Sequence, residues 1–320
     1  MFIKIGRRTF VTRLASAAAG LAGAFSMAHA AASPPKPLAL VEVAKGIFVY
    51  EGAQDLMNSV NAGAISNLGA IVGADAIAVI DSGGSIAEAH ALIAAIAAFS
   101  TKPIRYLINT HMHPDHVFGN AAFRDIGATI VGHRNLPRAL DARRDFYLRN
   151  VREQMGDEPM RGVEIVSPTL LVDDMMTLDL GGRTLDVKAW KPAHTDNDVT
   201  VFDPATRTLF TGDMVFVGHL PTVDGSLLGW MRQLDQLAAL DAARAVPGHG
   251  PATVPWPQAL DAERRYFDIL ARDLRKSIAD GVPLSEAVTT AAASERPNWT
   301  LFDVHNERNA TAAFAELEWE

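Results

Sequence analysis

The stretch THMHPDHVFGN contains four side chains of the types that bind metals, all within six consecutive positions. They are His111, His113, Asp115 and His116. Residues two apart on a helix point to different faces, so a helix would hold His111 and His113 apart. A strand that ends here and turns at Pro114 could instead bring all four together. The spacing therefore indicates a metal-binding turn.

Three further candidate ligands each follow a short apolar run that we expect to be a strand. They are His194 in PAHTDND, Asp213 in FTGDMVF and His249 in VPGHG. Loops that follow neighbouring strands can meet at one edge of a sheet. Five imidazoles and two carboxylates suit zinc, and iron or manganese also accept such ligands. Seven ligands are too many for one tetrahedral zinc, so the set predicts two metal ions with open positions for catalysis.

The elements that must position these residues read as alternating strands and helices up to about residue 250. VEVAKGIFVYEG predicts a strand pair with a Lys-Gly turn. The other expected strands are 63–73, 76–80, 104–108, 184–190, 198–202, 207–211 and 244–246. Helices are expected from residue 85, with apolar residues at 86, 89, 93 and 97, and at 134–155 and 226–240. A strand-rich stretch with a helix occurs twice, at 40–125 and 170–250, which predicts two αβ halves packed sheet against sheet.

Residues 257–320 read as a helical C-terminal part. Phe267, Leu270, Leu274 and Ile278 recur at helical spacing, so 257–280 is expected to be an amphipathic helix that covers the body. No long polar linker interrupts the sequence after the N-terminal region. We therefore expect residues 38–320 to form one domain.

The first thirty residues have the pattern of a signal peptide. A basic segment precedes a mild apolar run at 14–28 and the small-x-small site Ala28-His29-Ala30. The sequence GRRTFV resembles a twin-arginine signal, which predicts export of the folded protein to the periplasm. Residues 31–37 are then a spacer. The alternative is an uncleaved anchor, but the run is short for a membrane span, so none is expected after signal removal.

Charge and cysteine content exclude several classes of function. The chain has 29 basic and 37 acidic residues, and without Lys4, Arg7, Arg8 and Arg13 the basic count falls to 25, a net charge of −12. Nucleic acid is therefore not an expected partner, because phosphate contacts need a basic face. The sequence has no cysteine, which excludes disulfides, thiolate nucleophiles and thiolate ligands.

The motif HxHxDH, a distant histidine, an aspartate in TGD and a histidine in PGHG together resemble the metallo-β-lactamase-fold superfamily. The resemblance implies an αββα sandwich of two packed mixed β-sheets flanked by helices, here with a helical C-terminal segment. Longer stretches are similar to one exported subgroup, the quinoprotein relay system zinc metallohydrolases. They are THMHPDHVFGNAAF, AHTDNDVTV, GDMVFVGHLPTVDGSLLGW and NATAAFAELEWE. That likeness implies a link to a quinoprotein dehydrogenase or a cytochrome c.

The resemblance also implies the ligand sets and the activity. One zinc would be held by His111, His113 and His194, the other by Asp115, His116 and His249, with Asp213 bridging the two. We expect an exported dinuclear zinc hydrolase in which a metal-bridging hydroxide attacks the carbonyl of a small-molecule ester, thioester or lactone. Asp115 is the expected catalytic residue, because it can bind its metal and also orient the hydroxide or pass its proton on.

Three other functions remain open at this point. The first is a β-lactamase, although lactamase subclasses usually carry cysteine or serine where this chain has Asp213. The second is an iron redox enzyme, against which His116 and His249 complete a second-metal set. The third is a non-catalytic metal-binding accessory protein.

Several neighbouring residues have two readings. Asp81 could fix a ligand imidazole through its outer N–H, or cap the helix that begins near Ser85. For Asn197 the alternatives are an oxyanion donor and a local turn. His219 and Met57 are candidate substrate contacts, because they lie on loops that should border the site, although ordinary loop packing also explains Met57. We expect His305, in the C-terminal tail, to lie at the surface.

Overall fold

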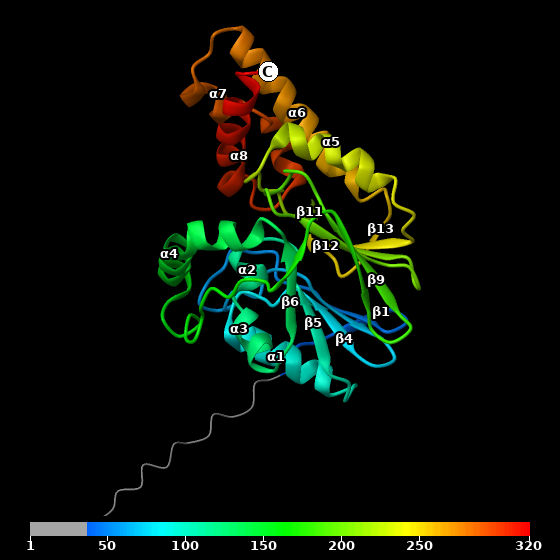
Figure 1. The fold of residues 1–320 in the computed structure, drawn as a ribbon. Coiled ribbons are helices and arrows are strands. Elements are labelled where there is room, and N and C mark those ends of the chain that lie inside the picture. Colours follow the sequence, from blue (N-terminus) through cyan, green and yellow to red (C-terminus); the bar gives the residue numbers. More distant parts are fainter. Residues whose placement is uncertain (1–36) are drawn as a thin grey trace, which may run out of the picture. The chain divides into compact units, whose positions relative to one another are not determined.

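The computed structural model describes residues 37–320 (Figure 1). The expected signal peptide at 1–30 and all but the last residue of the spacer at 31–37 lie outside the described residues, so both stay predictions. The described residues belong to one compact unit. None of the helices in this part of the chain is both long enough and apolar enough to span a membrane.

The first sheet has seven strands in the order of the sequence. Its first three pairings are antiparallel and its last three are parallel, so the sheet is mixed. The strands are β1 (Val41–Ala44), β2 (Ile47–Tyr50), β3 (Leu68–Val72), β4 (Ile77–Ile80), β5 (Ile104–Ile108), β6 (Thr129–His133) and β7 (Leu170–Val172).

The second sheet has six strands in the order β13-β12-β11-β10-β9-β8 and is also mixed, because β11 and β12 pair in parallel and the others pair antiparallel. Its strands are β8 (Met175–Asp179), β9 (Thr184–Ala189), β10 (Val199–Asp203), β11 (Thr208–Phe216), β12 (Arg244–His249) and β13 (Val254–Pro255).

Helices cover the outer face of each sheet (Figure 1). The first sheet is covered by α1 (Ile86–Ala97) and α3 (Asn120–Asp125), with α2 (Pro114–Val117) and α4 (Leu136–Met155) nearer the site. The second sheet is covered by α5 (Leu227–Ala238) and α6 (Leu260–Ala279). The helix α8 (Phe302–Leu317) packs on α5 and α6, with α7 (Leu284–Thr290) and a 3-10 turn at Ala293–Asn298 beside it. The expected αββα sandwich with a helical C-terminal segment is confirmed.

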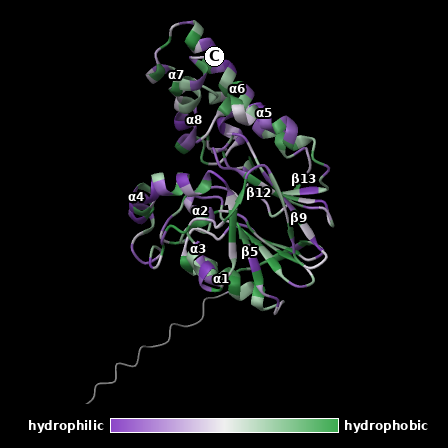
Figure 2. Cartoon of the chain, in the orientation of Figure 1, coloured by the Kyte–Doolittle hydropathy of each residue, from purple (hydrophilic) through white to green (hydrophobic). Residues whose placement is uncertain are grey.

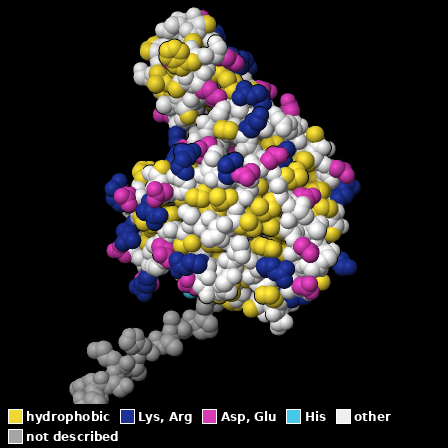
Figure 3. All heavy atoms as spheres, in the orientation of Figure 1, with side chains coloured by type: hydrophobic (Ala, Val, Ile, Leu, Met, Phe, Trp, Pro, Cys, Tyr) yellow, Lys and Arg dark blue, Asp and Glu magenta, His cyan; other side chains and the backbone are white. Residues whose placement is uncertain are grey.

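The layers follow from side-chain alternation in the strands. In β4, Ala78 and Ile80 point into the core between the sheets, whereas Ile77 and Val79 pack under α1. A strand that is buried on both faces reads as one apolar run, which is why AIAVI lacks alternation in the sequence. Figure 2 shows the same contrast between largely hydrophobic strands and helices with mixed hydropathy. Figure 3 shows basic and acidic side chains interspersed over the face in view.

The amphipathic helix expected at 257–280 is α6, which begins at Leu260. Its residues Phe267, Leu270 and Leu274 are buried in the core that α6 shares with α8. The Tyr266 hydroxyl donates to Asn306 Oδ1 on α8 at 3.0 Å, so a polar contact joins the two helices as well.

Three expected strands have clearly different bounds in the structure. The strand expected at 244–246 continues to His249, so His249 ends β12 rather than following it. The strand expected at 63–73 begins only at Leu68, because Asn67 instead bonds to the end of β12 through its backbone and side chain. The strand expected at 207–211 continues to Phe216, so Asp213 lies inside β11 rather than after it. The pairing of β11 with β12 shifts its register near Gly212, which has a φ of +51°. This bulge re-aims Asp213 without ending the strand.

We predict that Gly212→Ala lowers the free energy of unfolding by about 2 kcal/mol or more, because an alanine is strained at positive φ. A Cβ at this position would also lie 2.6 Å from the Thr110 Cβ. Gly127→Ala is the matched control, since Gly127 has a φ of +82° and its Cβ would meet no described atom within 4 Å. The control should lose about 1 kcal/mol. Urea unfolding measures both, and equal losses would contradict the close approach to Thr110.

Candidate metal centre

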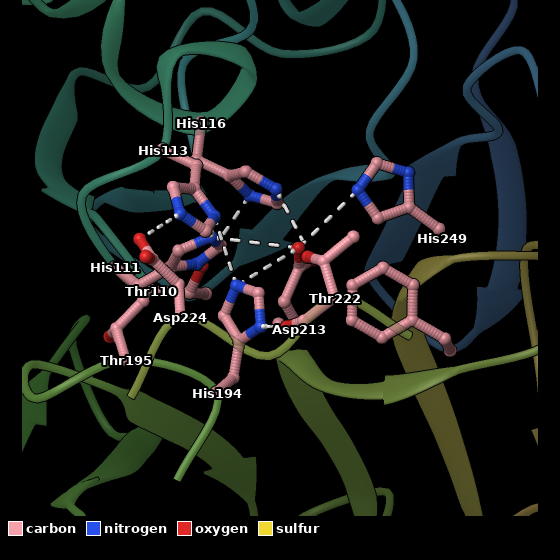
Figure 4. Close-up of polar contacts among 12 residues, drawn as sticks. Thr110, His111, His113, His116, His194, Thr195, Asp213, Thr222, Asp224 and His249 are labelled. Carbon is pink, nitrogen blue, oxygen red and sulfur yellow. Dashed lines mark hydrogen bonds and ion pairs between the residues drawn. The ribbon is translucent and has the colours of Figure 1, made fainter. Parts of the chain in front are cut away.

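The seven side chains expected to be ligands converge at the end of the sandwich where β5, β9 and β12 finish. Figure 4 labels all of them except Asp115. They come from the turn after β5, from α2, from the loop between β9 and β10, from the middle of β11 and from the last residue of β12. Their ligand atoms form two groups, each within 4.8 Å: His111, His113, His194 and Asp213, and then Asp115, His116 and His249.

In the first group, three ring nitrogens face one another. His113 Nδ1 lies 3.0 Å from His111 Nε2 and 2.9 Å from His194 Nε2. Asp213 Oδ2 lies 3.4 Å from His194 Nε2 and 3.6 Å from His111 Nε2. Four potential ligand atoms therefore surround one point.

The outer ring nitrogens of this group show which inner nitrogens lack a proton. His194 Nδ1 donates to the Thr222 carbonyl at 2.7 Å, and His113 Nε2 donates to Asp224 Oδ2 at 3.0 Å. A carbonyl and a carboxylate only accept, so in the neutral form of each ring the outer nitrogen carries the proton. The inner nitrogens of His113 and His194 then present lone pairs to each other at 2.9 Å. Such an arrangement is repulsive unless a cation lies between them.

Asp81 fixes one histidine of each group. Its Oδ2 accepts from His116 Nδ1 at 2.8 Å and from the Thr110 hydroxyl at 2.8 Å. Since the hydroxyl proton goes to Asp81, Thr110 Oγ1 can accept from His111 Nδ1, which lies 3.0 Å away. The helix α1 is capped by Ser85, whose side chain accepts from a backbone N–H of the first turn. The alternative that Asp81 caps this helix is therefore wrong, and the contact with a ligand imidazole is present.

The second group also brings acceptor atoms together. Asp115 Oδ2 lies 3.3 Å from both His116 Nε2 and His249 Nε2. Asp213 Oδ1 lies 3.3 Å from His116 Nε2, and Asp213 Oδ2 lies 3.4 Å from His249 Nε2. The outer nitrogen of His249 donates to the Ile65 carbonyl at 3.0 Å, so in the neutral ring its inner nitrogen is a lone pair that a metal can take. Asp213 therefore contacts both groups.

Two atoms at the centre of this arrangement are buried without a hydrogen-bond partner among residues 37–320. They are His116 Nε2 and Asp213 Oδ1. Buried polar atoms are ordinarily paired, so orphaned atoms indicate a missing partner. The donor set, borderline nitrogen and carboxylate oxygen, fits a divalent cation in each group.

The pKa values in the two groups differ in direction. Burial lowers the pKa of His194 to about 3, so this ring is neutral and can act as a ligand. Burial also lowers the pKa of His249, but Asp213 and Asp115 outweigh this and raise it to about 9. Although burial alone would raise the pKa of Asp115, the adjacent His116 and His249 hold it well below its usual range. A proton and a metal ion therefore compete for the second group.

A cavity of about 550 Å³ opens over both groups. The ligands His113, Asp115, Asp213 and His249 form part of its lining, so a bound molecule can reach both proposed metal positions. Met57 and His219 also line it, as expected. His219 is buried and stacks on His249, with ring centroids 5.0 Å apart, so it supports a ligand as well as bordering the cavity.

Two sequence-based readings need correction. Asn197 is not among the described residues that line the cavity. It lies buried in a turn in which the Thr195 backbone N–H donates to Asp198 Oδ2 at 2.9 Å, and Thr195 Oγ1 accepts from the Asn197 backbone. The structure therefore does not support Asn197 as an oxyanion donor. The turn is closed by the side chains of Thr195 and Asp198. His305 is half-buried and lines the cavity, because α8 folds back over the site.

Sequence reasoning missed several polar residues around the cavity. Asp224 bonds to His113, and Arg143 and Arg308 both pair with Asp224. The one available signal was an acidic residue beside glycine in TVDGS, within a loop expected to border the site. Arg143 and Tyr147 lie on α4, far from any motif, so no pattern in the sequence pointed to them.

Comparison with known proteins identifies the family. The sequence model of the metallo-beta-lactamase superfamily matches residues 62–249, which contain all seven candidate ligands. Beta-lactamase-like protein 2 homolog from Caenorhabditis elegans is 30% identical over 173 residues, 54% of this chain and 51% of that protein. Linear primary-alkylsulfatase from a Pseudomonas species is 23% identical over 213 residues, 55% of this chain and 40% of that protein. Human acyl-coenzyme A thioesterase MBLAC2 is 28% identical over 131 residues, 39% of this chain and 43% of that protein.

The chain thus spans about half or less of the length of these curated relatives. Among solved structures, a metallo-beta-lactamase from Pontibacter korlensis has a TM-score of 0.59 at 18% identity and covers 72% of this chain and 99% of its own. DIM-1 metallo-beta-lactamase has a TM-score of 0.56 at 16% identity, with 72% and 97% covered. Both show the fold. Because the family model covers more than half of the sequence, this chain belongs to the metallo-beta-lactamase superfamily.

Proposed function

We propose that this protein is a dinuclear metal-dependent hydrolase of an ester, thioester or lactone, with zinc as the metal and iron or manganese as alternatives. The observation that carries the proposal is the arrangement around Asp213. Its two oxygens contact both histidine groups, and the inner nitrogens of those groups face other acceptors beneath an open cavity. Such a site can hold two cations and still admit a substrate.

Two divalent cations supply an activated water at neutral pH and polarise a carbonyl when they are bound. The side chains of the protein position the reacting groups and transfer the proton. Asp115 lines the cavity, and its Oδ2 lies 3.3 Å from His249 Nε2 in the second group. Its carboxylate can accept a proton from the attacking water and return it to the leaving group. The histidines of the first group cannot act as this base, because their outer N–H groups already donate to neighbouring acceptors.

An acyl substrate suits the walls of the cavity. Leu56, Met57, Ile65 and Val151 line it together with Phe146, which is 55% exposed. Apolar walls beside a few polar groups are usual for small-molecule sites. The likeness to an acyl-coenzyme A thioesterase supports an acyl bond, and the likeness to an alkylsulfatase makes a sulfate ester a second substrate to test.

The alternatives from the sequence can be separated by experiment. The β-lactamase structures share the fold at 16–18% identity, which carries no substrate assignment. A non-catalytic accessory protein would bind metal but turn over no substrate. Export to the periplasm and a link to a quinoprotein dehydrogenase or cytochrome c also belong to the proposal, and both are supported only by the sequence motifs.

The metal-loaded protein should hydrolyse at least one member of a panel of a 4-nitrophenyl ester, an acyl thioester and a lactone. Asp115→Asn, which keeps an oxygen at this position but cannot take a proton, should lower kcat at least about a hundredfold. Asp173→Asn is the control, because Asp173 is 70% exposed in an ion pair with Arg134. Nitrocefin and an alkyl sulfate complete the panel. Turnover of nitrocefin alone would show a β-lactamase, and no turnover at all would favour an accessory role.

Asp81→Asn should weaken zinc binding about ten- to a hundredfold, because one of the two ligand histidines that Asp81 fixes loses its acceptor. Competition against a chromophoric chelator measures the affinity. Ser85→Ala is the matched control, since it removes the N-cap of α1 and should cost about 1 kcal/mol of stability while leaving zinc affinity unchanged. Unchanged zinc affinity in Asp81→Asn would contradict the orienting role.

A further inference from the structure

We propose that Arg143, Tyr147 and Arg308 form a subsite for an anionic group of the substrate, beside the first histidine group. This inference rests on the proposed function for its setting and adds the chemistry of the substrate: an acyl compound that carries a carboxylate or another oxyanion. All three residues line the cavity over the candidate ligands.

A helical face from α4 forms one wall of this subsite. Arg143 and Tyr147 are four residues apart, so they project from the same side of the helix. Four further residues of α4 line the cavity at matching helical spacing: Phe146, Asn150, Val151 and Gln154. This stripe faces the cavity over about three turns. The third residue, Arg308, comes from α8, so the subsite forms only when the C-terminal helices fold over the site.

The two arginines outnumber the one carboxylate that pairs with them. Arg143 contacts Asp224 through Nη1 at 2.8 Å and Nη2 at 3.1 Å, and Arg308 Nη2 lies 3.3 Å from Asp224 Oδ1. Asp224 Oδ2 also accepts from His113 Nε2 at 3.0 Å. A guanidinium has five N–H donors, so most of those on Arg308 remain free for a ligand. Arg143, Arg308 and Asp224 together therefore carry a net charge of +1. Only the ring of His113 separates them from a candidate metal position.

Tyr147 adds an uncommitted donor beside Arg143. The side chain is 4% exposed, and its hydroxyl has no hydrogen-bond partner in the described part of the chain. Burial raises the pKa of this phenol above its usual value, so the hydroxyl stays protonated and can donate. An unpaired hydroxyl in a cavity wall is costly unless a ligand or water satisfies it.

The acidic residues that line the cavity contact partners other than the two arginines. Asp115 and Asp213 face the histidine groups. Asp55, on the loop before β3, accepts from the Leu56 backbone N–H at 2.7 Å and from Asn58 Nδ2 at 3.1 Å. The apolar side chains of this loop and of α4 then suit the hydrocarbon part of an acyl chain. An amphiphilic anion fits both features.

The test uses matched esters. The esters are 4-nitrophenyl hexanoate, the 4-nitrophenyl monoester of adipate, which adds a carboxylate on the acyl side, and 4-carboxyphenyl hexanoate, which adds it on the leaving group. The wild type should have a lower KM for one of the anionic esters. Arg308→Gln should raise that KM about tenfold and Tyr147→Phe about threefold, with the neutral ester changed less than about twofold. Arg144→Gln, next to Arg143 on α4 but outside the cavity lining, should change none of them.

The proposal fails if the neutral and anionic esters respond equally to Arg308→Gln, or if the wild type does not prefer an anion. Calorimetry with adipate and hexanoate separates this failure from a failure of the proposed function. Adipate should bind more tightly than hexanoate and lose about tenfold in affinity in Arg308→Gln. That result would support the subsite even if no ester is cleaved. Equal binding of the two acids, or no effect of the variant, would overturn it.

Discussion

The geometry of the site depends on ring nitrogens that face one another at close range. His113 Nδ1 and His194 Nε2 are 2.9 Å apart, and each ring has already committed its proton to an outer acceptor. No hydrogen bond can join two unprotonated nitrogens, so the protein holds an arrangement that is unfavourable until a cation binds. Around Asp213, Oδ1 and the facing His116 Nε2 are buried without hydrogen-bond partners in the part of the chain described. The fold must supply the energy that keeps these atoms together.

The αββα sandwich meets this requirement by tying each imidazole to a different element. His194 is held by the carbonyl of Thr222, His249 by that of Ile65, and His116 by the carboxylate of Asp81 after β4. Each of these acceptors is separated by many residues from the histidine it fixes, so the geometry depends on the packing of both sheets. Asp81 is central to this, because through Thr110 it also reaches His111. Stability of the fold and affinity for metal are therefore coupled.

The part of the site that the sequence predicted is the part encoded locally. HxHxDH follows β5, whose bounds at 104–108 were predicted correctly, and the fold followed from strand patterns and the resemblance. Asp213 was expected after a strand, but a bulge at Gly212 lets β11 run through it, and hydrophobic pattern does not report bulges. Arg143, Asp224 and Arg308 come from three distant segments, so only the folded chain brings them together. His305 reaches the cavity for the same reason.

The central claim is that the facing acceptors hold two divalent cations. Equilibrium dialysis of the purified protein against buffered zinc at neutral pH, with metal counted per chain, tests it most directly. We expect saturation at two zinc ions per chain and a rise in Tm on loading, because only the folded state holds the ligands together. Saturation at one ion would contradict the role of Asp213 between two groups. Failure to bind zinc, iron or manganese, with no change in Tm, would contradict the metal centre itself.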